Sequence, residues 1–299
     1  MFRVLVCLFV FALSGWTAAQ PLEAGFRNPP DWARPWVYWF WLNGNITREG
    51  ITADLEAMQR VGIGGVLIME VDQGVPLGPV PFASPQWRDL FKHVVSEAHR
   101  LDLEVNMNND AGWCGSGGPW VPPDKAMQKL VWTETQVTGP AHVEIILPKP
   151  PAIAGYYRDV AVLAFPTPAG DTRIPDIVGK AAFVRQEFIL PASYPEPDTS
   201  SIVKYENVIN LTSFMKEDGT LAWDAPEGRW TVLRIGHTPT GAMNAPSPAS
   251  GRGLECDKLS KEGIEAHFAG FMAKLISDVG ELSGKTLVAT HIDSWEVGS

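Results

Sequence analysis

Three short apolar runs, each separated from the next by an amphipathic stretch, constrain the fold of this chain more than any other feature. The runs cover residues 36–42, 64–70 and 103–107, and their β-branched and aromatic side chains are typical of buried strands. Residues 46–61 and 86–101 carry apolar side chains at helical spacing. The order strand, helix, strand, helix, strand predicts a parallel α/β sheet.

This pattern changes after residue 130. A short helical stretch is expected near residues 123–130, and short alternating runs separated by Pro-rich turns then continue to about residue 240. These runs predict an all-β, sandwich-like insertion. A helix over residues 261–279, with Ser260 as its N-cap, and a strand over residues 286–292 then resume the first pattern.

The predicted fold class is therefore α/β, a partial (β/α)8 TIM barrel of about four strands interrupted by an all-β insertion. Residues 20–130 are assigned to the first part of the barrel and residues 131–240 to the inserted domain. In residues 241–299 the barrel resumes, and it is truncated after its fourth strand.

The first nineteen residues read as a signal peptide. Arg3 supplies a positive charge, residues 4–13 are apolar, and small residues up to Ala19 offer a cleavage site. We therefore expect an exported protein, periplasmic or extracellular, whose apolar leader is too short for a membrane span. The mature chain keeps only Cys114 and Cys256. They are expected to be separate, buried thiols, and the alternative is one disulfide between them.

Charge and aromatic content narrow the choice of partner. The net charge of −10, without Lys/Arg clusters, argues against nucleic acid. The chain has 12 Trp and 13 Phe residues, which serve either core packing or the stacking of flat rings on sugars. A neutral small molecule or polysaccharide fits this composition best, and no oligomeric state is predicted.

Polar and aromatic side chains gather where the predicted strands end, which is the edge at which barrel enzymes carry their sites. Carboxylates, amides and indoles are the groups that read sugar hydroxyls and cover apolar sugar faces. The candidate substrate-binding residues are Trp41, Asn43, Asn108, Asp110, Trp113, Asp293 and Trp295, together with the candidate acid Glu296.

Glycoside cleavage needs one carboxyl group that holds a proton and a second that acts as a base or nucleophile. Glu296 is the candidate general acid, because the neighbouring Trp295 offers an apolar surface that would raise its pKa. The alternative is an exposed loop acid. Glu70 and Asp72 are weak candidates for binding a hard cation, against the alternative of solvated loop acids.

Several motifs in a fixed order resemble glycoside hydrolase family 106, the α-L-rhamnosidases. The opening Arg34-Pro-Trp-Val-Tyr-Trp-Phe-Trp-Leu-Asn-Gly-Asn-Ile-Thr47, then Gly117-Gly-Pro-Trp120, Gly253-Leu-Glu-Cys-Asp257 and Asp293-Ser-Trp-Glu296 carry this resemblance. It implies a secreted, calcium-dependent enzyme that hydrolyses rhamnosides with inversion, using a (β/α)8 barrel. In that scheme Glu296 resembles the general acid, the second carboxylate lies on a later strand, and this chain alone is expected to be inactive.

Two alternatives stay open. A catalytically inactive carbohydrate-binding protein would keep the same aromatic and polar cleft. A glycosidase of another specificity, such as a β-galactosidase-like enzyme, would keep the barrel and change the sugar.

Overall fold

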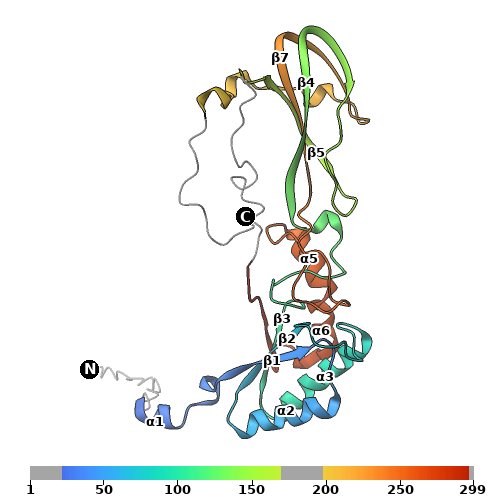
Figure 1. The fold of residues 1–299 in the computed structure, drawn as a ribbon. Helices are drawn as coiled ribbons and strands as arrows, with labels where there is room; N and C mark the ends of the chain where they lie inside the picture. Colours follow the sequence, from blue (N-terminus) through green and yellow to red (C-terminus); the bar gives the residue numbers. More distant parts are fainter. Residues whose placement is uncertain (1–21, 170–197, 296–299) are drawn as a thin grey trace, which may run out of the picture.

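The computed structural model describes residues 22–169 and 198–295, in which two sheets lie toward opposite ends of an elongated molecule (Figure 1). The parallel sheet has the strand order β1-β2-β3-β8. Its strands are β1 (Trp36–Leu42), β2 (Gly65–Val71), β3 (Glu104–Asn108) and β8 (Leu287–His291). The predicted parallel α/β sheet is therefore confirmed, whereas its closure into a barrel stays a prediction.

Two helices connect the first three strands and cover one side of the sheet. They are α2 (Arg48–Arg60) and α3 (Pro85–Arg100). The hydroxyl of Thr47 accepts a hydrogen bond from the Gly50 amide, and that of Ser84 accepts one from the Trp87 amide. These bonds satisfy N–H groups that a helix start leaves without intrahelical partners, so each helix begins directly after its capping residue.

The pleat of β1 decides which side chains enter the core. Trp39 and Trp41 are buried on the side of the helices, which we call the helix face, while Tyr38 and Phe40 on the opposite, inner face are 55% and 47% exposed. The core of the helix face contains Trp39, Trp41, Ile51, Leu55, Ile68, Trp87, Phe91, Val94, Val95, Val105 and Met107.

The predicted third helix is two helices in the structure. These are α5 (Lys261–Gly270) and α6 (Met272–Val279), and the break falls at Phe271, whose φ and ψ are −130° and −79°. Gly270 is a poor helix former, and its backbone lies against the Trp120 indole. Arg88 of α3 forms two 2.6 Å hydrogen bonds with Asp278 and thereby ties α6 to the sheet layer.

The β-rich region forms a four-stranded antiparallel sheet in the order β4-β7-β5-β6. Its strands are β4 (Gln128–Ile146), β5 (Arg158–Pro166), β6 (Ile209–Asn210) and β7 (Thr220–Pro239). Within the described residues these strands make one sheet rather than the two of a sandwich. Its core gathers Val137, Leu147, Val162, Ala164, Leu211, Leu221, Trp223, Trp230 and Val232.

The helical stretch expected near residues 123–130 is wrong for most of its length. A 3-10 turn covers Pro123–Lys125, and β4 begins at Gln128, because pairing with β7 overrides the local preference of this segment. The division of the chain into domains stays a prediction. A short helix, α1 (Leu22–Arg27), precedes the parallel sheet.

Cys114 and Cys256 are buried and form no disulfide in the described part of the chain, as predicted. Among residues 22–169 and 198–295, no helix combines the length and apolar character that a membrane span requires.

Candidate active site

The carboxyl end of β3 carries a buried polar group. Asn108 is fully buried, and its amide donates hydrogen bonds to Asp110 Oδ1 (2.9 Å) and to the Gly112 carbonyl oxygen (2.6 Å). Asp110 is fully buried too, and its Oδ2 accepts no hydrogen bond from the described residues. Burial, together with the nearby charge of Glu255, raises the pKa of Asp110 well above its usual range, so this carboxyl group favours its protonated form.

Behind Asp110 lies an ion pair that the sequence analysis did not assign to the site. Glu255 and Lys258 are buried and hydrogen-bonded to each other. Glu255 belongs to the Gly253–Asp257 motif that carries part of the family resemblance, which was the available signal. Buried charges are almost always paired, and this buried ion pair beside a buried carboxyl group therefore forms one connected polar centre.

His267 of α5 holds the loop that follows β3. Its Nδ1 accepts hydrogen bonds from Trp120 Nε1 (3.1 Å) and the Gly117 amide (3.3 Å), so its Nε2 carries the proton that is donated to the Asn109 carbonyl oxygen (2.9 Å). Burial lowers the pKa of His267 to about 4, and the charge of Lys258 acts in the same direction. The neutral histidine therefore holds the loop of residues 109–120 in place through these three hydrogen bonds.

The segment after β8 lies along the same loop. The Ser294 amide donates to the Trp113 carbonyl oxygen (2.9 Å), which places Asp293 beside the loop at Trp113. Asp293 Oδ1 lies 3.5 Å from His291 Nε2, and the Asp293 side chain is 34% exposed. The structure thus brings Asn108, Asp110 and Asp293 to one edge of the sheet, with Asp293 as the carboxylate that solvent can reach.

Trp41 and Glu70 do not join this group, contrary to the prediction from their strand-end positions. They are register partners on adjacent strands, and both point to the helix face, where Trp41 packs edge-on against Trp39 and Trp87. Glu70 accepts hydrogen bonds from the Gly44 amide (2.9 Å) and Trp87 Nε1 (3.1 Å). Burial raises its pKa to about 7, although both hydrogen bonds oppose that shift.

Asn43 and Asp72 shape loops instead. Asn43 has a φ of 51°, a left-handed conformation that Asn tolerates, and its amide donates to the Val75 carbonyl oxygen (2.7 Å). Asp72 Oδ1 accepts a hydrogen bond from the Gly74 amide (3.1 Å). Trp295 is 54% exposed, as a sugar-stacking ring would be, and Glu296 lies outside the described residues.

The pair of Glu70 and Asp72 does not fit a calcium site. Each oxygen of Glu70 already accepts an N–H hydrogen bond, and the side chain faces the tryptophan-rich core. Calcium needs six to eight oxygen ligands, and the described residues contain no group of three Asp, Glu, His or Cys side chains arranged to hold a metal. A separate cavity of about 300 Å³, bordered by Phe82, Trp120 and Phe271, contacts none of the predicted site residues.

Residues 27–174 and 169–299 match the model of a family described as alpha-L-rhamnosidase, glycoside hydrolase family 106. The chain belongs to glycoside hydrolase family 106. Its membership agrees with the resemblance carried by the sequence motifs.

Two proteins that are similar to this chain have informative names. A rhamnosidase structure from Novosphingobium sp. PP1Y is similar with a TM-score of 0.74 and 26% identity over 92% of this chain. A Formosa agariphila protein that carries the provisional name beta-glucuronidase is 42% identical over 93% of this chain. The chain spans 40% of the length of the former and 24% of the latter.

Proposed function

We propose that this chain forms part of an exported glycoside hydrolase that cleaves α-L-rhamnosides. The observation that carries the proposal is the strand-end group of Asn108, Asp110 and Asp293 within a family-106 chain that is similar to a rhamnosidase. Amide and carboxyl side chains in fixed positions can read the hydroxyl groups of one sugar, and the exposed Trp295 ring can cover an apolar sugar face.

The parallel sheet is proposed to be a segment of a (β/α)8 barrel. The concave inner face supports this, because the rings of Tyr38 and His291 meet across it from the two edge strands. In such barrels the catalytic groups stand at the carboxyl ends of the strands, which is the edge where Asp293 lies.

The proposed mechanism is hydrolysis with inversion by two carboxyl groups. Glu296 is the proposed general acid, since it follows Asp293 by three residues after β8 and adjoins the apolar Trp295. Asp293 is proposed to bind substrate or to orient that acid. Asp110, buried and favouring its neutral form, is proposed to fix Asn108 and the loop rather than to touch the reacting atoms.

Hydrolysis of a β-glucuronide is the second candidate, favoured by the name of the Formosa relative. Chromogenic α-L-rhamnoside, β-D-glucuronide and β-D-galactoside, tested on the complete protein that carries this sequence, separate these readings. We expect the rhamnoside to be cleaved at least about tenfold faster, with β-L-rhamnose as the first product seen by NMR. Faster cleavage of the glucuronide would show that the substrate is a β-glucuronide instead. Saturable sugar binding without turnover would show that the protein binds carbohydrate and does not hydrolyse it.

Calcium dependence and export are further proposals that rest on the resemblance and on the first nineteen residues. Chelation with EGTA is expected to lower activity at least about tenfold, and added Ca²⁺ is expected to restore it. N-terminal sequencing of the secreted protein is expected to begin near Gln20. Activity that survives chelation, or a cell-retained protein that starts at Met1, would contradict the respective proposal.

A further inference from the structure

A second hollow lies on the antiparallel sheet, remote in the fold from the strand ends of the parallel sheet (Figure 1). Its volume of about 410 Å³ is in the range of small-ligand sites, about 300–1,000 Å³. The end of β4, the start of β5, the turn before β7 and β7 itself form its walls. The residues that decide its chemistry are Lys149, Tyr157, Arg158, Glu217, Asp218 and Arg234.

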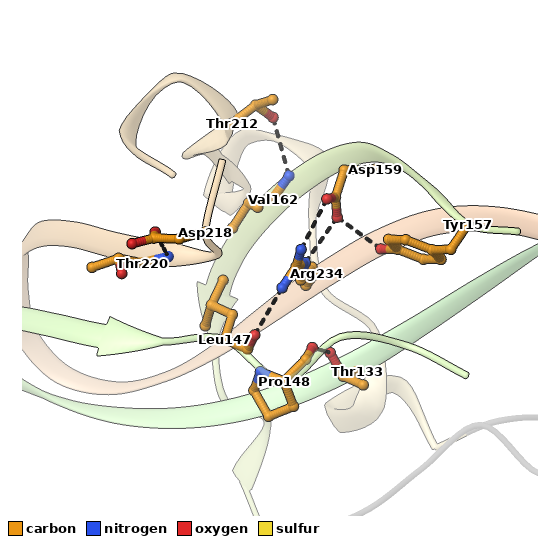
Figure 2. Close-up of polar contacts among 10 residues, drawn as sticks. All are labelled: Thr133, Leu147, Pro148, Tyr157, Asp159, Val162, Thr212, Asp218, Thr220 and Arg234. Carbon is orange, nitrogen blue, oxygen red and sulfur yellow. Dashed lines mark hydrogen bonds and ion pairs between the residues drawn. The ribbon is translucent and has the colours of Figure 1, made fainter. Parts of the chain in front are cut away.

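The floor of this hollow is built around Arg234, whose side chain is only 7% exposed (Figure 2). Its guanidinium donates to both oxygens of Asp159, at 2.8 and 2.9 Å, and to the Leu147 carbonyl oxygen at 2.8 Å. These hydrogen bonds connect the end of β4 with β5 and β7. The charges of Arg234 and Asp159 neutralise each other. The floor is therefore rigid and without net charge.

Tyr157 supplies a flat ring that is fixed at its tip and along one side. Its hydroxyl group donates to Asp159 Oδ1 at 2.7 Å, as Figure 2 shows, and burial beside that carboxylate raises the pKa of Tyr157, so the donor keeps its proton. A Cβ added to Gly236 would lie 2.4 Å from the ring carbon Cζ, which means that the ring rests on the backbone of β7. A partly exposed aromatic ring held in this way is prepared for stacking at little entropic cost.

Charges of both signs stand around this ring. Apart from Arg234 and Asp159, the charged residues that line the hollow in the described part of the chain are two cations, Lys149 and Arg158, and two acids, Glu217 and Asp218. Lys149 Nζ lies over the Tyr157 ring, 5.2 Å from its centroid, and Arg234 Cζ lies 6.0 Å from the same centroid. A ligand that stacks on the solvent side of the ring therefore displaces the flexible Lys149 ammonium. Two cationic and two acidic side chains together offer both hydrogen-bond donors and acceptors, which suits a ligand with many hydroxyl groups, whereas a charged ligand would meet a like charge on one side.

We propose that this hollow is a secondary binding site for a neutral sugar unit of a glycan, stacked on Tyr157 and held by the surrounding charged side chains. The proposal goes beyond hydrolysis at the strand ends, since it concerns binding alone. A second contact of this kind would retain a polymeric substrate near the enzyme and raise its effective concentration at the hydrolytic site.

The test is an NMR titration of the full chain, labelled with ¹⁵N, with methyl α-L-rhamnopyranoside and methyl β-D-galactopyranoside as neutral probes. Methyl β-D-glucuronide and methyl β-D-glucosaminide serve as anionic and cationic probes. A neutral probe is expected to shift the amide signals of Lys149, Tyr157 and Gly236. The shifts should persist in Asp293→Asn, which separates this site from the proposed hydrolytic one.

Substitution of the ring gives the decisive comparison. Tyr157→Ala should weaken neutral-sugar binding at least about tenfold, whereas Tyr157→Phe, which keeps the ring, should stay within about threefold of the wild type. Tyr205→Ala is the matched control, because Tyr205 lies in the same β-rich region and is 92% exposed. Its affinity should equal that of the wild type.

Three results would overturn the proposal. They are wild-type affinity in Tyr157→Ala, a response to charged probes only, and the absence of shifts at these amides up to the solubility limit of both neutral probes. If thermal denaturation shows that Tyr157→Ala is unfolded, Lys149→Ala and Glu217→Gln on the rim decide instead. Unchanged affinity in both rim variants would then refute the site.

Discussion

The rings of Tyr38 and His291 lie edge to face, with centroids 6.5 Å apart and planes at 84°. These residues stand on β1 and β8, the two edge strands of a four-stranded sheet. In a flat sheet, three strand spacings of about 4.8 Å would separate these strands by about 14 Å. The contact therefore shows that the inner face is concave and that residues at the end of β8 face the aromatic side chains of β1.

Asp293, the solvent-accessible carboxylate close to His291, lies at the end of β8, beside this concave face. We expect Asp293→Asn to lower kcat/KM for a rhamnoside by about 10²–10⁴-fold, because the side chain keeps its shape and loses its charge. The thermal midpoint should hardly change. Steady-state kinetics and thermal denaturation on the complete protein that carries this sequence measure both quantities.

Asp102→Asn provides the matched control for that experiment. Asp102 is an exposed acid between α3 and β3, at the opposite edge of the sheet, and its φ of 56° suits Asn equally well. Its kcat/KM should stay within about threefold of the wild type. Equal losses in both variants, or none in Asp293→Asn, would remove Asp293 from the site.

The general-acid role proposed for Glu296 makes a separate prediction. Glu296→Gln should lower turnover of rhamnosides with poorly activated leaving groups by about 10²–10⁴-fold, because Gln cannot donate a proton. Substrates with good leaving groups need less protonation, so their rates should fall much less. Near-normal rates across a series of leaving groups would show that another residue is the acid.

Glu70 should make stability depend on pH. Its folded-state pKa is raised from 4.5 to about 7, so between these values the folded protein holds a proton that the unfolded chain has released. The stabilisation is complete below pH 4.5 and is lost as the pH rises to 7, by about 3 kcal/mol in total. Urea denaturation of Glu70→Gln at several pH values should show that the free energy of unfolding no longer declines over this range. If its dependence on pH equals that of the wild type, Glu70 is charged in the folded state.

His267 should contribute the opposite slope in nearly the same range. Its folded-state pKa is lowered from 6.5 to about 4, so the unfolded chain binds a proton first as the pH falls. Stability is complete above pH 6.5 and is lost toward pH 4, again by about 3 kcal/mol. His267→Gln should abolish that loss, and a variant that weakens equally with acid would contradict a neutral His267.

These two contributions should nearly cancel in the wild type. Between pH 4.5 and 6.5 Glu70 loses stabilisation as the pH rises, whereas His267 gains it. The single variants are therefore expected to change the wild-type slope in opposite directions, and the double variant should show the sum of the two changes. Additivity is expected because the contacts of Glu70 with Trp87 and of His267 with Trp120 share no residue.

The elements of the fold could be predicted where local signals are strong. Apolar runs gave the parallel strands to within about one residue, and Thr47, Ser84 and Ser260 each cap the helix that follows. The single helix over residues 261–279 was wrong because Phe271 interrupts it, at a point where Gly270 must pass close to Trp120. A contact between residues 150 positions apart leaves no periodic signal in the sequence.

The sequence by itself determined the family, the parallel α/β order and the strand-end position of Asn108, Asp110 and Asp293, since each follows from local patterns or motifs. Only the tertiary structure decided which strand-end side chains share a face. The pleat sends Trp41 and Glu70 into the helix-covered core, and folding places Glu255, Lys258 and His267 beside the loop after β3. Which side chains share a face depends on strand register and long-range packing, and both are set only when all the elements assemble.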